Sequence, residues 1–194
     1  MEIYNNYIFA ITKALKKLNL KKIYEIEKII FKKIKNGNKI FICGNGGSAS
    51  VASHFLCDFN KGIKLSSSKK LLPKIISLND NISLITAISN DIGYSKIFTY
   101  QFENYFNKDD LLITLSCSGS SKNIIDILNF AKKNNVFTIA LTGFVNRRNK
   151  KKSDININFK IQNFGICEDM FQIIMHMISQ NIRKKVLKNK KEIL

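Results

Sequence analysis

The sequence of 194 residues has only one proline, no closely spaced pair of cysteines and no apolar run near the length of a membrane span. A spanning helix needs about 20 consecutive apolar residues. The first residues also lack a basic segment ahead of an apolar core. We therefore expect a cytoplasmic chain with no membrane partner.

The four cysteines do not form the CxxC pairs that are typical of zinc-binding loops. We expect buried free thiols at Cys43, Cys57, Cys117 and Cys167. A metal-binding role is a weaker alternative for Cys57 and Cys167, which stand beside acidic residues.

Acidic residues are scarce, because 14 Asp and Glu face 32 Lys and Arg, which gives a formal net charge of +18. Such an excess is typical of nucleic-acid-binding proteins. The lysines here, however, are spread along the amino-terminal segment and the tail, as solvated helix faces and biased codon usage produce. We expect no nucleic-acid partner, but we do expect the charge to attract anionic substrates.

A chain of this length is expected to form one domain over residues 1–194, with an amino-terminal helical extension at 1–36 and an α/β unit at 37–194. Apolar residues at helical spacing predict two helices within 1–36. Short β-rich runs predict strands at Lys39–Cys43, Lys74–Leu78, Leu111–Leu115, Val136–Leu141 and Ile155–Ile161. Helical stretches are expected at Gly47–Phe59, Ile82–Asn90, Lys96–Phe106, Ser121–Asn134 and Glu168–Lys190.

Strands that alternate with helices favour parallel pairing. The expected fold is a three-layer α/β sandwich with a central five-stranded parallel sheet flanked by helices. The polar stretches Lys61–Leu72 and Asn146–Ser153 are expected to be loops. Ligands of such sheets bind at the carboxyl ends of the strands, and the candidate motifs fall at those ends.

The stretch Ile40–Asp58, IFICGNGGSASVASHFLCD, places a glycine-rich turn between a strand and a helix. Glycines let the backbone turn sharply and approach a ligand, while the helix start offers unpaired N–H groups and a positive dipole end. Phosphate is the ligand that we expect at this turn. His54 and Asp58 stand four residues apart, so they share a helix face and could hold a metal or move a proton together.

A second turn, Ser116-Cys117-Ser118-Gly119-Ser120-Ser121, follows the third predicted strand and opens a helix. Clustered hydroxyl groups there can cradle a phosphate or simply cap the helix. Its position at the same end of the sheet as the glycine turn favours a shared ligand. Asn90-Asp91, before Gly93, is a weaker signal that also fits a polar helix end.

The last predicted helix carries Glu168, Asp169 and His176. Glu168 and His176 lie within roughly 80° of each other around a helix, so they can face one site. A histidine among apolar neighbours is more often a core residue. The chain has only two histidines, however, and the other belongs to the glycine-turn segment, which favours functional roles for both.

Five ordered segments between about Lys39 and Gln180 together resemble the sugar isomerase (SIS) family and, within it, the phosphoheptose isomerases. They read CGNGGSASVASHF, ISND-GY, LSCSGSSKNII, ALTG and NFGICEDMFQIIMH. The resemblance implies an aldose-ketose isomerase that converts sedoheptulose 7-phosphate into D-glycero-D-manno-heptose 7-phosphate for lipopolysaccharide or capsule heptoses. It also implies one zinc ion per subunit and a homotetramer.

The resemblance further implies roles for particular residues. Asp58 would be the catalytic base and His176 the acid. The metal ligands would be His54, Asp58, His176 and Glu168, with Gln172 as the rival of Glu168. The substrate-binding pattern falls on Asn45, Gly46, Gly47, Ser48, Asp58, Asn90, Asp91, Ser116, Cys117, Ser118, Ser121 and Glu168.

The sequence departs from the family pattern at three of these positions. Asp58 stands where glutamate is usual, which withdraws the carboxylate by one methylene, and catalytic positioning tolerates little such error. Cys117 removes one hydroxyl from the serine loop, and Glu168 replaces the usual glutamine. These changes keep an alternative open: a non-catalytic SIS protein that binds a phosphosugar or a protein partner, as replication-initiator-associating relatives do. Retention of His176 argues against that alternative.

Overall fold

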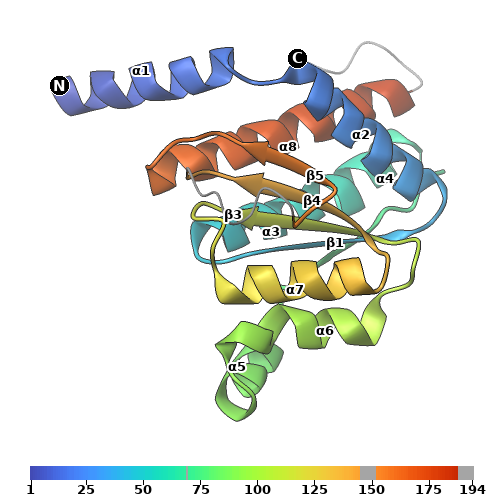
Figure 1. Cartoon of the computed structure of the whole chain (residues 1–194). Helices are drawn as coiled ribbons and strands as arrows, with labels where there is room; N and C mark the ends of the chain where they lie inside the picture. Colours follow the sequence, from blue (N-terminus) through green and yellow to red (C-terminus); the bar gives the residue numbers. More distant parts are fainter. Residues whose placement is uncertain (69, 145–151, 188–194) are drawn as a thin grey trace.

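The structure is a computed structural model that describes residues 1–68, 70–144 and 152–187. Five parallel strands form one sheet in the order β2-β1-β3-β4-β5. Helices cover both of its faces (Figure 1). The strands are β1 (Lys39–Gly44), β2 (Lys74–Ser77), β3 (Leu111–Ser116), β4 (Phe137–Thr142) and β5 (Ile155–Asn158). The expected three-layer α/β sandwich is confirmed.

The two faces of the sheet carry different sets of helices. One face packs against helices whose buried side chains form a single cluster with the sheet: α2 (Leu20–Lys35), α3 (Gly47–Cys57) and α8 (Phe164–Val186). The other face packs against α5 (Ile82–Asp91), α6 (Ile97–Tyr105) and α7 (Lys122–Lys133). The first helix, α1 (Glu2–Lys16), has no buried residue and lies beside α8 (Figure 1).

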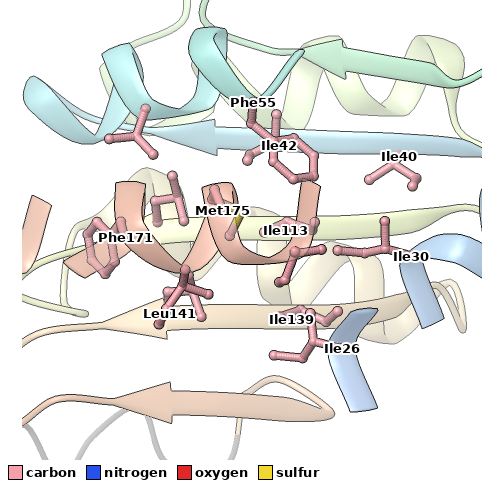
Figure 2. Packing of buried hydrophobic residues seen from close by; sticks show 14 of the residues in the cluster. Ile26, Ile30, Ile40, Ile42, Phe55, Ile113, Ile139, Leu141, Phe171 and Met175 are labelled. Atoms are coloured by element: carbon pink, nitrogen blue, oxygen red, sulfur yellow. The ribbon is translucent and has the colours of Figure 1, made fainter. Parts of the chain in front are cut away.

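Strand β1 shows how the sequence produces this layering. Alternate side chains of a strand point to opposite faces, and Ile40 and Ile42 join the cluster on one face while Phe41 and Cys43 join the cluster on the other. A strand that is buried on both faces reads as a continuous apolar run. The packing on the first face, around residues from α2, α3 and α8, is visible in Figure 2.

The segment after α3 differs from the expected loop. The helix continues into a π-helix, Asp58–Ile63, and then a short turn, α4 (Lys64–Ser66). Phe59 and Ile63 are fully buried, and the ring centroids of Phe55 and Phe59 are 4.2 Å apart. Burial of these side chains therefore extends the helical segment into the first part of the predicted loop.

Two other boundaries differ from the sequence prediction by three residues or more. Helix α8 begins at Phe164, four residues before the expected start, because the Asn163 side chain caps it by accepting a hydrogen bond from the Ile166 N–H at 3.0 Å. Strand β5 ends at Asn158, not Ile161. Most of the predicted loop 146–153, and the predicted helix end beyond 187, lie outside the described residues.

The cysteine prediction is correct for three residues and wrong for one. Cys43, Cys117 and Cys167 are buried free thiols, whereas Cys57 is exposed at the end of α3. In the described part of the chain, no helix combines the length and the apolar character that a bilayer crossing requires.

Candidate active site

The two predicted turns lie at the carboxyl ends of neighbouring strands. Gly44, the last residue of β1, pairs with Leu115 of β3, so the glycine turn and the serine loop start side by side. Gly46 has a φ of +57°, a left-handed conformation that strains residues with a Cβ. The glycine turn therefore needs a glycine at this position in order to start α3.

His54, Asp58 and His176 form one cluster. Helix α3 supplies His54, Asp58 follows directly at its end, and α8 supplies His176. The Asp58 Oδ1 atom lies 3.6 Å from His54 Nε2, and its Oδ2 atom lies 3.7 Å from His176 Nε2. The two Nε2 atoms are 3.0 Å apart. Helices α3 and α8 thus bring together residues that the sequence separates by 122 positions.

Two further side chains of α8 support the cluster. The Ser179 hydroxyl donates a hydrogen bond to Asp58 Oδ2 at 3.1 Å. The Gln172 amide lies 2.8 Å from His176 Nε2. These contacts orient the carboxylate and the imidazole toward each other.

The donor set fits a divalent transition metal. One ligand atom from each of His54, Asp58 and His176 lies within 4.8 Å of the others. Two imidazoles and a carboxylate are the ligands that catalytic zinc sites use, with a position left for water or substrate. The residues present are therefore suited to zinc.

Glu168 lies elsewhere, at the glycine turn. A Cβ built on Gly47 would overlap the Glu168 carboxylate, so this glycine leaves the space that the carboxylate fills. The Cys117 Sγ atom is 4.0 Å from Glu168 Oε1. Glu168 consequently stands between the glycine turn and the serine loop. Gln172, the alternative metal ligand, is the residue that contacts His176.

The serine loop is organised by its own hydroxyl groups. Ser116 Oγ accepts a hydrogen bond from the Gly119 N–H at 3.1 Å, and Ser118 Oγ accepts one from the Ser120 N–H at 3.2 Å. Ser121 is the N-cap residue of α7, and its side chain makes no capping hydrogen bond. The helix start thus keeps N–H groups that a phosphate can accept from.

Cys117 and Cys167 face each other beside this loop. The interaction between the two thiols lowers the pKa of Cys117 and raises the pKa of Cys167. Ser48, buried at the start of α3, lies 3.8 Å from Cys117 Sγ. Cys117 therefore connects the two turns by contact, although it cannot replace the hydrogen-bonding strength of a hydroxyl.

Asn90 and Asp91 are less closely tied to the cluster. Both are exposed at the end of α5, and the Asn90 amide donates to Asp91 Oδ1 at 2.8 Å. Apart from this bond to each other, neither is hydrogen-bonded to a predicted site residue in the ranges that the structure describes.

Three residues with contacts at the site were not predicted from the sequence: Ser179, Tyr94 and Asn123. Tyr94 and Asn123 lie inside the quoted ISND-GY and LSCSGSSKNII segments, and both are hydrogen-bonded to Asn45. Only their place within these segments could have pointed to them. Ser179 carries no motif signal, although it stands three residues after His176 on the helix.

A cavity of about 690 Å³ lies away from these residues, between α1, the turn into α2, and β5. It is lined by Lys13, Lys17, Lys22 and Lys160 among others, and by none of the motif residues. We place the candidate active site at the His54 cluster because acid, base and metal-ligating groups converge there and not in the cavity.

Comparison with known proteins agrees with the fold. The sequence model of the SIS domain matches residues 3–143, so the chain belongs to the SIS domain family. It is 39% identical over 155 residues to the phosphoheptose isomerase of Aliarcobacter butzleri, and 80% of each chain is covered. It is 35% identical over 179 residues to the probable phosphoheptose isomerase of Thermoplasma acidophilum, which covers 92% of this chain and 97% of that protein.

A solved structure points to the same group. The phosphoheptose isomerase from Francisella tularensis superposes with a TM-score of 0.85 at 26% identity, over 94% of this chain and 95% of that one. Within the SIS family, the chain belongs with the phosphoheptose isomerases, and the resemblance read from its motifs is confirmed.

Proposed function

We propose that this chain is a phosphosugar ketose-aldose isomerase that converts sedoheptulose 7-phosphate into D-glycero-D-manno-heptose 7-phosphate. The observation that supports it most directly is the convergence of His54, Asp58 and His176 at the carboxyl end of α3, in a chain of the phosphoheptose isomerase group. The product would enter the synthesis of surface heptoses. Free buried cysteines fit the reducing cytoplasm, where we place the enzyme.

The reaction moves a proton between adjacent carbons and passes through an enediolate. It needs a base, an acid and stabilisation of charge on oxygen. The Asp58 carboxylate, held by the Ser179 hydroxyl, is the proposed base. His176, which lies beside Asp58, is the proposed acid.

Zinc held by His54, Asp58 and His176 would polarise the sugar oxygens. For the remaining protein ligand we favour Gln172, whose amide lies 2.8 Å from His176 Nε2. Glu168, at the glycine turn, is then left to contact the sugar.

The substrate would lie across the two turns. Asn45, Gly46, Gly47 and Ser48 are proposed to line the sugar, and the loop of Ser116, Cys117, Ser118 and Ser121 to hold the phosphate. The open start of α7 supports the second assignment. Asn90 and Asp91 are proposed to reach the substrate from the end of α5.

Turnover of sedoheptulose 7-phosphate by the zinc-loaded protein, followed by NMR of the sugar, tests the proposal. We expect Asp58→Asn and His176→Ala to lower kcat by roughly 100-fold or more, the scale of general acid-base catalysis. Asp109→Asn, an exposed change away from the cluster, is the control and should keep full activity. Binding of the phosphosugar without turnover would favour the non-catalytic alternative.

A further inference from the structure

Three segments of the chain meet at the side chain of Asn45. Asn45 Nδ2 donates to Asn123 Oδ1 at 3.0 Å, and Asn123 Nδ2 donates back to Asn45 Oδ1 at 2.9 Å. The Tyr94 hydroxyl donates to Asn45 Oδ1 at 2.9 Å. Asn123 is 2% exposed. The glycine turn is thereby tied to the first turn of α7 and to the short helix Tyr94–Lys96.

The backbone fixes which way round these amides stand. The Ile124 N–H donates to Asn123 Oδ1 at 3.0 Å, and a backbone N–H can only donate. The oxygen of Asn123 must therefore occupy that position, which leaves its nitrogen facing Asn45. That nitrogen also only donates, so Asn45 must present its oxygen to it. One main-chain group thus sets the orientation of two side chains.

A count of hydrogen-bonding capacity shows what remains for a ligand. An asparagine amide has two N–H donors and two acceptor positions on its oxygen. At Asn45, the Asn123 amide and the Tyr94 hydroxyl take both acceptor positions, and Asn123 takes one donor. The second N–H of Asn45 has no partner within the described ranges. Asn45 can offer a ligand a donor but not an acceptor.

We propose that Asn123, assisted by Tyr94, is a positioning residue that makes Asn45 a dedicated hydrogen-bond donor to an acceptor oxygen of the sugar. This inference rests on the proposed function and deepens it. A fixed N–H favours a carbonyl or a developing oxyanion, where negative charge increases during the reaction. A donor that is already oriented needs no rearrangement as that charge forms.

The Asn123→Asp substitution tests the assignment because it keeps the size of the side chain. The carboxylate oxygen that replaces Nδ2 would face Asn45 Oδ1, so neither orientation of the Asn45 amide would be satisfied. We expect kcat/KM for sedoheptulose 7-phosphate to fall roughly 10- to 100-fold at pH 8, the scale of a buried unsatisfied polar group. The protonated carboxyl can donate in place of Nδ2.

The ratio of variant to wild-type kcat/KM, measured at each pH with saturating zinc, should therefore recover as the pH falls from about 8 toward 5, because burial raises the pKa of a carboxyl. Asn123→Leu removes the donor at every pH and should show a constant deficit. Tyr94→Phe leaves the pair of amides in place and should lower kcat/KM less than Asn123→Leu does. Asn129→Asp, on the exposed face of the same helix, should match the wild type throughout.

Three results would overturn the inference: an unchanged rate for Asn123→Asp, a deficit that does not vary with pH, or equal pH profiles for the Asp and Leu variants. If the wild-type protein still isomerises the sugar, any of these three results rejects only the role of Asn123, and the proposed function stands. If the wild type does not turn over, Kd for sedoheptulose 7-phosphate replaces kcat/KM in the same comparison, and absence of binding rejects both proposals. Circular dichroism of each variant verifies the fold.

Discussion

Gly47 and Glu168 illustrate how closely single residues are matched at the site. A methyl group at Gly47 would overlap the carboxylate of Glu168, so the Gly47→Ala variant must displace it. Because the atoms that the methyl group meets are the far end of a flexible side chain, which can move aside, we expect a loss of no more than about 1 kcal/mol of folding stability, the low end of the cost of overpacking. In the Glu168→Ala background the same change should cost less, since the obstructing group is gone. Urea unfolding of the four proteins in this cycle measures the difference.

Gly46 is the matched control for that cycle. A Cβ there meets no atom within 4 Å, but the φ of +57° remains unfavourable for alanine. Gly46→Ala should therefore cost about 1 kcal/mol through backbone strain, with the same value whether Glu168 is present or not. Equal costs for Gly47→Ala in both backgrounds would show that the carboxylate does not rest on Gly47.

Tyr7 makes a prediction that depends on pH. Its hydroxyl donates a 2.5 Å hydrogen bond to Asp169 Oδ2, and this bond raises the Tyr7 pKa to about 12. Folding thus holds the proton more tightly than the unfolded chain does. The stabilisation is present below pH 10 and is lost as the pH rises toward 12. A pH titration followed by ultraviolet absorbance should show a tyrosine that loses its proton near pH 12. This step should be absent in Tyr7→Phe and shifted to lower pH in Asp169→Ala.

At the scale of elements, α8 determines which residues reach the cluster. Gln172 and Glu168 stand four and eight positions before His176, yet only Gln172 contacts it. We expect Gln172→Ala to weaken zinc binding about 10- to 100-fold and Glu168→Ala to weaken it much less. Competition with a chromophoric chelator measures this. Gln180→Ala, exposed on the same helix, is the control, and the reverse ranking would restore Glu168 as the ligand.

The elements also show where sequence reasoning succeeds. Alternating apolar and helical runs were enough to predict the five strands and the layers, because parallel strands between helices must be buried on both faces. The residues 61–66 were misassigned, since their polar composition hides the burial of Phe59 and Ile63. One sequence segment was enough to predict that His54 and Asp58 act together, because a helix places residues four positions apart on the same face.

Particular contacts between side chains of different elements could not be predicted from the sequence pattern. Helical periodicity places Glu168, Gln172 and His176 near one face, but the packing of α8 on α3 decides which of them approaches His54. The link of Asn45 to Tyr94 and Asn123 spans 49 and 78 positions. No local propensity encodes such a hydrogen bond, because it exists only after the strands have brought the loops together.

At the scale of the whole molecule, the net charge of +18 should influence the capture of substrate. Positive potential steers anions toward a protein, and salt screens it over a Debye length of about 10 Å at 0.1 M. We expect kcat/KM for sedoheptulose 7-phosphate to fall as NaCl is raised, while kcat changes little. A kcat/KM that is independent of salt would show that the charge has no part in catalysis.

Helix α1 presents large apolar side chains without cover in the chain itself. Ile3, Tyr4, Ile8 and Phe9 are 61–75% exposed, and such a patch is typical of an interface. This supports the homotetramer that the family resemblance implies. We expect Phe9→Glu to lower the mass measured by light scattering, whereas Lys108→Glu, an exposed change outside this helix, should leave it unchanged. A wild-type monomer would contradict the proposed assembly.

The contact between His54 and His176 closes a loop of 122 positions. Loop closure over such a span costs entropy that only later packing can offset. During synthesis the amino-terminal part emerges first, so His54 and Asp58 leave the ribosome long before α8 exists. The sheet and its first helices can form in that interval, but the reactive cluster cannot. Chemical competence is consequently the last property that the nascent chain acquires.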